Sequence, residues 1–250
     1  MAIATAPQWF DSHVHLERYS PVEVAAMRSR AGDVGVAALL AVSTSLEASR
    51  RTVALPPEVW RAVGVHPTQA DSLTADVHRE LDALAGLPGV VAIGETGFDA
   101  AGPSPAEQRR AFAAQCDLAR HRGLALILHI DGLGAWDELV ASAEALTGLR
   151  VIRHYFQGGA AEATWHRDRG HYLSFGRPLL RAPALQRLAR DYPSDLLLIE
   201  TDTYPLPGRT TEPRDLVPVG EALAVLRGWT IAECAEQLWS NSRAALALPG

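Results

Sequence analysis

The chain has 250 residues, of which 48% are hydrophobic and 21% charged, and its formal net charge is -6. This composition argues against long disordered segments and excludes a global basic field for nucleic acid or an anionic membrane. All 23 basic residues are arginines, which excludes a Schiff-base lysine and a carbamylated-lysine metal bridge. The length suits a single domain over residues 1–250, the usual size of an eight-stranded α/β barrel.

The cysteines and the apolar runs indicate a cellular compartment. Cys116 and Cys234 both fall in segments with helical periodicity, so we expect buried free thiols in a reducing environment. Residues 1–7 lack the pattern of a secretory signal, and the longest apolar run, 34–42, is too short to span a bilayer. We therefore expect a soluble cytoplasmic protein without membrane contact; its oligomeric state stays open.

Apolar, β-branched runs alternate along the chain with segments of helical periodicity. Strands are expected over residues 9–15, 34–43, 59–65, 90–94, 124–129, 150–154, 172–175 and 195–200. Helices are expected over residues 21–30, 46–54, 73–85, 104–122, 134–146, 160–169, 182–191, 212–226 and 230–246. Eight alternating units predict a parallel sheet closed into a (β/α)8 TIM barrel, and no Gly-rich dinucleotide fingerprint follows any strand. The loop over residues 203–213, rich in Pro, Gly and Thr, is the candidate for a mobile lid.

Two histidines one residue apart end the first predicted strand. The two-residue period of a strand sends His13 and His15 to one face and Val14 to the other. Neutral imidazole is the commonest protein ligand for a divalent transition metal. Two histidines in this pattern can equally be the polar end of a strand. Whether they bind a metal therefore depends on the residues at the other strand ends.

Further histidines and carboxylates follow the ends of the other predicted strands. They are His66 after the third strand, Glu95 after the fourth, His129 and His154 at the ends of the fifth and sixth, and Asp202 after the eighth. These ends meet at one face of a barrel, where so many polar groups would be costly to desolvate without a cation. The remaining histidines are expected to be surface or structural groups: His78, His121, His166 and His171.

Four of these histidines (His13, His15, His129 and His154) and the two carboxylates give six candidate ligands, more than one tetrahedral zinc ion needs. Two divalent ions about 3.5 to 4 Å apart, sharing one carboxylate, are the economical arrangement. Because the chain has no lysine, Glu95 is the natural bridge. A cage of imidazoles and carboxylates accepts Zn, Mg, Mn, Fe or Ni, so the sequence leaves the metal open.

In this order the motifs resemble the TatD family of metal-dependent hydrolases, within the amidohydrolase-type barrels. The matching segments are FDSHVHLE at 10–17, GVHP at 64–67, GETGFD at 94–99, LH at 128–129, HYFQGG at 154–159, LSFG at 173–176, ETD at 200–202, EP at 212–213 and Asn241. The resemblance implies a TIM barrel with one divalent metal at His13, His15, Glu95 and Asp202, and a second at Glu95, His129 and His154. It also implies that Asp202 is the general base and that His66 lies near the substrate phosphate.

The chain departs from the family pattern around the substrate. Members usually carry an arginine two residues after the strand-five histidine, where this chain has Asp131. Members usually have a basic residue, Arg and Asn before the Glu-Pro turn; here Arg209, Thr210 and Thr211 stand there, so one of two positive charges remains. Thr68 stands where members have a histidine just after His-Pro. The predicted metal ligands are intact while the groups that hold an anion are fewer.

Three functions are compatible with these residues. The first is hydrolysis of a DNA phosphodiester by water activated between two metals, with Asp202 and Glu95 catalytic and Arg177 and Arg209 as candidate phosphate contacts. The second keeps the metals and cleaves an amide, formyl or lactone group of a small molecule, with Asp131 holding an amine or hydroxyl. The third is a barrel kept only for binding. Around the ligands, Glu17, Asp99 and Glu200 are expected to orient the metal site, Gly94 and Gly97 to permit a tight backbone, and Asn241 to tie the last helix to the barrel.

Overall fold

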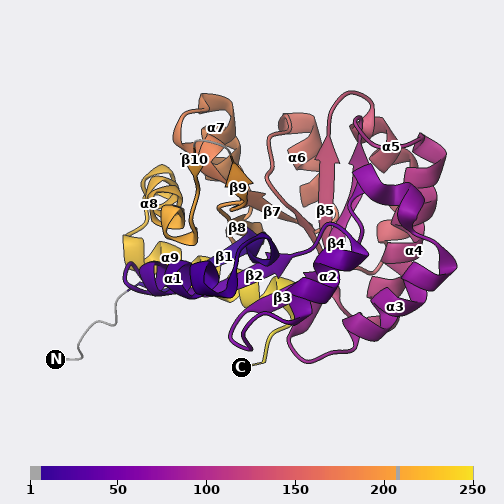
Figure 1. Ribbon diagram of the computed structural model, residues 1–250. Coiled ribbons are helices and arrows are strands. Elements are labelled where there is room, and N and C mark those ends of the chain that lie inside the picture. The colour runs from indigo at the N-terminus through magenta and orange to yellow at the C-terminus, as the bar shows by residue number, and fades with distance from the viewer. Residues whose placement is uncertain (1–6, 207–208, 250) are drawn as a thin grey trace.

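The computed structural model describes residues 7–206 and 209–249, with only the backbone of residues 209 and 210. In these residues eight parallel strands pair in the order β1 to β8, as an (β/α)8 barrel requires (Figure 1). The strands are β1 (Trp9–Val14), β2 (Val36–Val42), β3 (Trp60–Val63), β4 (Val90–Asp99), β5 (Ala125–Asp131), β6 (Val151–Arg153), β7 (Tyr172–Phe175) and β8 (Leu197–Ile199). The predicted barrel is therefore confirmed.

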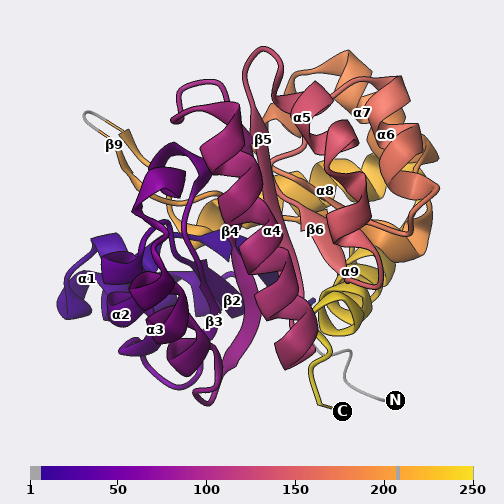
Figure 2. The same cartoon turned by 90° about the vertical axis from the view of Figure 1, so that its right-hand side faces the viewer.

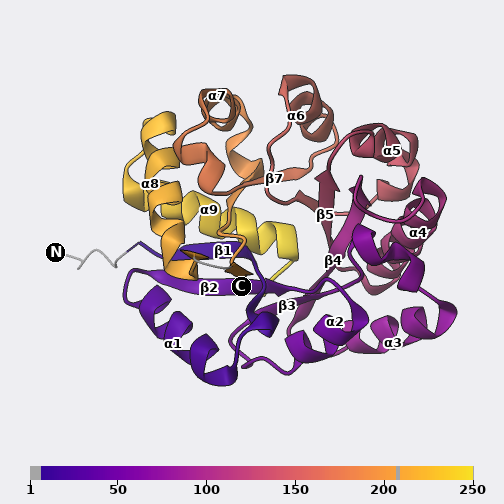
Figure 3. The same cartoon turned by 45° about the horizontal axis from the view of Figure 1, so that its top comes forward.

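Helices surround these strands (Figure 3). The described α-helices are α1 (Pro21–Gly32), α2 (Leu46–Val53), α3 (Ala75–Ala85), α4 (Pro105–Arg122), α5 (Ala135–Ala141), α6 (Ala160–Arg167), α7 (Pro183–Asp191), α8 (Leu216–Arg227) and α9 (Ile231–Leu246). Short 3-10 turns are η1 (Leu16–Arg18), η2 (Pro67–Ser72), η3 (Ala143–Leu146), η4 (Arg177–Leu180), η5 (Ser194–Leu196) and η6 (Pro213–Asp215). No helix among the described residues is long and apolar enough to cross a membrane.

Two predicted helices and one strand differ from the sequence expectation. The helix expected over 134–146 divides into α5 and η3, and the one expected over 212–226 begins as η6 before α8. The strand expected to stop at Gly94 continues to Asp99, because β4 resumes pairing with β5 beyond an irregularity between Ile93 and Thr96. Two glycines that resemble strand breakers instead allow β4 to bulge and continue.

The strand alternation sorts side chains between the barrel interior and the surrounding helices. Leu40, Ile127 and Ile152 belong to the interior cluster, and Leu246 of α9 packs in the same cluster. Asn241 of α9 donates through Nδ2 to the carbonyls of Ser194 (2.7 Å) and Leu197 (2.8 Å), at the start of β8. Its predicted role in tying the last helix to the barrel is confirmed, and the predicted free thiols Cys116 and Cys234 are likewise buried.

The strands β1 and β8 close the ring through a junction that we call the seam. In the described part of the chain, the seam has a single parallel bridge between Val14 and Thr203 rather than a ladder. Below it, the Asp11 carboxylate accepts hydrogen bonds from the backbone N–H (3.0 Å) and hydroxyl (2.6 Å) of Thr201. Ser12 Oγ donates to the last carbonyl of β8 at 3.0 Å. Side chains therefore supply much of the hydrogen bonding that closes the barrel.

The loop expected to form a lid contains a small hairpin of β9 (Pro205–Leu206) and β10 (Arg209–Thr210). Figure 2 shows it projecting from the body of the molecule. Residues 207 and 208 lie outside the described residues, and movement of this loop stays a prediction.

Candidate metal centre

The paired histidines of the first strand converge as their spacing predicts. His13 lies in β1 and His15 directly after it, and their Nε2 atoms are 3.3 Å apart. His15 Nδ1 lies 2.8 Å from the carbonyl oxygen of Val42, which can only accept a hydrogen bond. Nδ1 therefore carries the proton, and the Nε2 lone pair of His15 faces the centre.

Glu95 lies between two pairs of histidines. Its Oε2 is 3.3 Å from Nε2 of His13 and 3.7 Å from Nε2 of His15. Its Oε1 is 2.9 Å from Nδ1 of His129 and 2.9 Å from Nε2 of His154. One carboxylate thus presents one oxygen to each pair of imidazoles.

The bulge in β4 brings Glu95 to this position. Gly94 and Gly97 have φ values of 148° and 144°, which L side chains rarely adopt. A Cβ on Gly97 would lie 1.9 Å from the carbonyl oxygen of His129, so β4 and β5 approach too closely there for any side chain. Both glycines have the backbone role expected of them.

Asp202 reaches the centre from the other side of the seam. It follows β8 with a left-handed φ of 50°, and its backbone N–H donates to the carbonyl of His13 at 3.0 Å. Its Oδ1 then lies 3.4 Å from Nε2 of His15 and 3.8 Å from Nε2 of His13.

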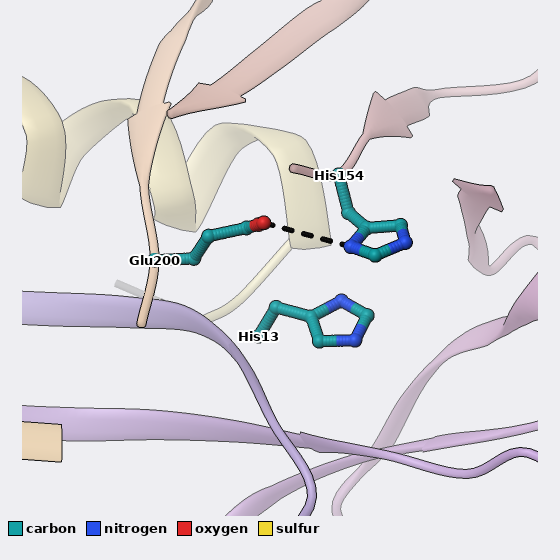
Figure 4. Close-up of side chains that lie close together, drawn as sticks. All are labelled: His13, His154 and Glu200. Carbon is teal, nitrogen blue, oxygen red and sulfur yellow. Dashed lines mark ion pairs between the residues drawn. The ribbon is translucent and has the colours of Figure 1, made fainter. Parts of the chain in front are cut away.

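Further carboxylates contact the outer nitrogens of the histidines. Glu200, fully buried, lies with an oxygen 3.5 Å from Nδ1 of His154, and Figure 4 shows its carboxylate directed at the His154 ring, with His13 nearby. Asp99 Oδ2 lies 3.1 Å from Nε2 of His129. These carboxylates fix the rings so that the inner nitrogens face Glu95. Glu17 is more distant, 4.0 Å from Nδ1 of His15.

The carboxylates and imidazoles shift one another's pKa values. Burial acts to raise the pKa of Glu95, but His154 and His13 hold it well below its usual range. At Asp202 burial is again outweighed, and the neighbouring His15 and His13 lower the pKa to about 2. Against burial, Glu95 raises the pKa of His154 to about 10. Both carboxylates are ionised at neutral pH. Because Asp202 and Glu95 also raise the pKa of His15 to about 9 against burial, a bound cation would displace protons from His15 and His154.

The buried atoms of the centre fit divalent cations. Glu95 Oε2 is buried without a hydrogen-bond partner, an arrangement that is costly unless the oxygen ligates a cation. Among the described residues, four groups of three each place one ligand atom per residue within 4.8 Å of one another. The two made only of predicted ligands are His13, His15 and Asp202, and Glu95, His129 and His154; the other two include Glu200, and His66 with Asp99. The Oε2 atom of Glu95 also faces the first group, so two adjoining sites of nitrogen and oxygen donors share this residue.

Two cavities open on the centre. The smaller, about 280 Å³, is lined by His15, Arg18, Thr44, His66, Thr68, Gln69, Glu95 and shared residues. The larger, about 420 Å³, is lined among others by Asp131, Trp136, Arg153, Tyr155, Gln157 and Glu162. Both include His129, His154, Asp202 and Tyr204. A substrate can therefore contact the centre and either cavity at once.

Of the four residues predicted to contact substrate, two line the cavities at the centre. His66 Nε2 lies 3.5 Å from Glu95 Oε1, and Asp131 lines the larger cavity. Arg177 is exposed at the start of η4 and lines neither of the two cavities as described. The side chain of Arg209 lies outside the described residues. The substrate roles of all four stay predictions.

Several cavity residues carry no sequence signal of the kind used above. Trp136 and Glu162 come from α5 and α6, and Arg153 is the last residue of a strand that is otherwise apolar. None of the three is a histidine or carboxylate at the end of a strand, so the strand-end pattern does not indicate them. Arg18 and Tyr204 also line the cavities, and they follow the motifs at 10–17 and 200–202 without belonging to them.

An eight-stranded parallel barrel with imidazoles and carboxylates gathered at the carboxyl ends of its strands defines a metal-dependent hydrolase. Residues 10–247 match the family model for the TatD related DNases. The chain belongs to the TatD family. It is 35% identical to the "Uncharacterized metal-dependent hydrolase TatD" of Mycobacterium tuberculosis, over 95% of this chain and 97% of the relative.

Two further comparisons agree on the family and the fold. The protein named "3'-5' ssDNA/RNA exonuclease TatD" of Cronobacter sakazakii is 36% identical, over 77% of this chain and 74% of the relative. The crystal structure of YJJV, a TatD homologue from Escherichia coli, superimposes with a TM-score of 0.87 at 24% identity. That alignment covers 98% of this chain and all of the other, so the fold is shared over its whole length.

Proposed function

We propose that this TatD-family hydrolase cleaves phosphodiester bonds of single-stranded DNA, using two divalent cations that share Glu95. The observation that carries the proposal is the position of Glu95, with one carboxylate oxygen toward His13 and His15 and the other toward His129 and His154. The names of several relatives, such as the 3'-5' ssDNA/RNA exonuclease of Cronobacter sakazakii, support nucleic acid as the substrate.

Different residues of the site have different roles in the proposed hydrolysis. When bound, the cations would lower the pKa of a water molecule and polarise the phosphate. Asp202 accepts the proton of that water at a carboxylate oxygen and orients the water for attack. Glu200 and Asp99 keep the inner nitrogens of His154 and His129 turned toward the centre. His66, beside Glu95, offers an Nε2 atom to the substrate phosphate.

The test is release of nucleotides from single-stranded and double-stranded DNA oligonucleotides after loading with Mg, Mn, Zn or Ni. Turnover of the single strand with at least one metal, lost on chelation and restored by the metal, is the expected result. No release of nucleotides with any of these metals would refute the proposal.

A second candidate is hydrolysis of an amide, formyl or lactone group in a small molecule. Asp131 lines the larger cavity, where a carboxylate repels phosphate and can hold an amine or hydroxyl. On the DNA proposal, Asp131→Arg improves DNA cleavage by removing this repulsion; on the alternative, it impairs turnover of small amides. Asp137→Arg, which makes the same charge change at an exposed site on α5, is the matched control.

A further inference from the structure

Arg153 is a buried cation without a carboxylate partner. It ends β6 and is only 6% exposed. Ile152 packs in the barrel interior and Val151 among the outer helices, so the two-residue period sends Arg153 to the helix side. A strand residue at that position is ordinarily apolar, and a guanidinium there stays charged at neutral pH.

The hydrogen bonds of Arg153 run to backbone carbonyls and not to a carboxylate. Nη2 donates to the carbonyl of Ile130 at 2.7 Å, and Nη1 donates to the carbonyl of His154. Throughout residues 7–206 and 209–249, as far as side chains are described, no carboxylate forms an ion pair with it. Two backbone carbonyls engage only part of its five N–H groups, and Glu200, Glu162, Asp131 and Glu95 act on its charge only from beyond ion-pair distance. A buried charge without an ion-pair partner is expensive.

The guanidinium lines the larger cavity, the one that opens on the metal centre. This cavity extends from His129 and His154 to Trp136 on α5 and Glu162 on α6. Trp136 is held by Trp165, whose ring lies edge-on to it at a centroid distance of 5.2 Å. A substrate group that lies against Arg153 is therefore part of a molecule that also reaches the centre.

We propose that Arg153 binds a second anionic group of the substrate, separate from the group being hydrolysed. The inference rests on the proposed function, under which this group is the phosphate neighbouring the scissile one in a DNA strand. A guanidinium fork matches the oxygens of a phosphate, and the backbone carbonyls that hold Arg153 fix its orientation. Asp131 and Glu162 line the same cavity and repel an anion, so the guanidinium of Arg153 is the favourable place for a phosphate along it.

The first test compares two DNA oligonucleotides on the metal-loaded enzyme. One has ordinary phosphates, and in the other the linkage next to the scissile one is a neutral methylphosphonate. Arg153→Gln is expected to raise KM for the ordinary strand about tenfold or more, with kcat little changed, and to leave KM for the methylphosphonate strand unaltered. Arg153→Lys, which keeps the charge, should recover most of the loss.

The control is Arg167→Gln, because Arg167 lies on α6 with an exposed guanidinium paired to Asp168. It should leave both KM values unchanged. A purely structural role for Arg153 predicts equal losses on the two strands, and that result, or no loss on either, would overturn the inference.

A second test stands even if the protein does not cleave DNA. In the zinc-loaded protein, the side-chain N–H signal of Arg153, assigned by its absence from Arg153→Gln, is followed by NMR during titration with inorganic phosphate. The signal should move and saturate while that of Arg167 stays in place. An Arg153 signal that phosphate leaves unmoved would refute the anion site, whereas absent nuclease activity refutes only the proposed function.

Discussion

Glu95 is the residue on which the candidate centre depends. It is 3% exposed, yet its Oε2 atom has no hydrogen-bond donor, while its Oε1 atom faces His129 and His154. Its two oxygens lie 2.9 to 3.7 Å from ring nitrogens of all four predicted histidine ligands: His13, His15, His129 and His154. Replacing it therefore affects both proposed metal positions at once.

Glu95→Gln keeps the shape of the side chain and removes its charge. We expect it to lower metal occupancy at both positions and to reduce turnover by at least about 100-fold. Elemental analysis of the purified variant, together with nucleotide release, measures the two effects. A variant that retains two metals per chain with ordinary activity would contradict the bridging role.

Glu200 acts through a histidine and needs a different measurement. Its carboxylate lies 3.5 Å from Nδ1 of His154 and also accepts the backbone N–H of Tyr155. Glu200→Gln is expected to weaken metal affinity by about 10- to 100-fold, because the His154 ring loses its charged partner. Competition with a chelator measures the affinity; activity restored at high metal concentration would identify a positioning residue, and unchanged affinity would exclude one.

At the scale of the element, β4 carries the most functional geometry. Its central bulge brings Glu95 to the centre, and pairing with β5 resumes beyond it from Thr96 to Asp99. The bulge depends on close backbone contact, since a Cβ on Gly97 would overlap the carbonyl of His129. The geometry of the proposed ligand His129 is therefore coupled to the absence of a side chain on the neighbouring strand.

Gly97→Ala tests that coupling. The added methyl forces β4 and β5 apart, with an expected loss of about 1 to 3 kcal/mol in the free energy of unfolding and reduced metal occupancy. Urea denaturation and elemental analysis measure these effects. Gly32→Ala, near the end of α1 where a Cβ meets nothing within 4 Å, should be neutral or slightly stabilising. Equal stability of the two variants would show that the strands accommodate the methyl.

The order of elements and the ends of the strands could be predicted from sequence because both follow local patterns. His13, His15 and His154 follow apolar runs, and a parallel barrel brings all such ends to one face. The continuation of β4 beyond Gly94 could not be predicted from sequence. Gly97 is needed there because the backbone of β5 comes too close for a side chain, and this contact is known only from the fold. Arg153 was missed because a charged residue facing the helices has meaning only once the cavity is known.

At the scale of the whole molecule, a second buried histidine pair affects acid stability. His166 and His171 were expected to be surface or structural, and both are buried, with their Nδ1 atoms 3.0 Å apart. Burial and the neighbouring charge of His171 lower the pKa of His166 to about 2, and burial lowers that of His171 to about 4. The pair packs against the aromatic rings of Trp165 and Phe156, away from the centre.

These depressed pKa values set the direction of the pH dependence. The unfolded chain binds protons at these histidines below about pH 6.5, whereas the folded chain does not until far lower pH, so stability falls as pH drops below 6.5. At pH 5 each histidine accounts for about 2 kcal/mol of this loss. His171→Gln should reduce the fall in unfolding free energy between pH 7 and pH 5 by about that amount. His121→Gln, on the exposed face of α4, is the control; an identical fall in wild type and His171→Gln would contradict the assignment.

The seam gives the centre a mechanical consequence. His13 and His15 lie on the β1 side of the seam and Asp202 lies on the β8 side. A cation bound by all three would therefore link the first and last strands of the barrel. Removal of the metal by a chelator would then destabilise the barrel at the junction that has the fewest backbone hydrogen bonds, and not a peripheral loop. Metal supply would thus control the lifetime of the fold as well as its chemistry, and amide exchange along β1 and β8 should quicken first when the ions are withdrawn.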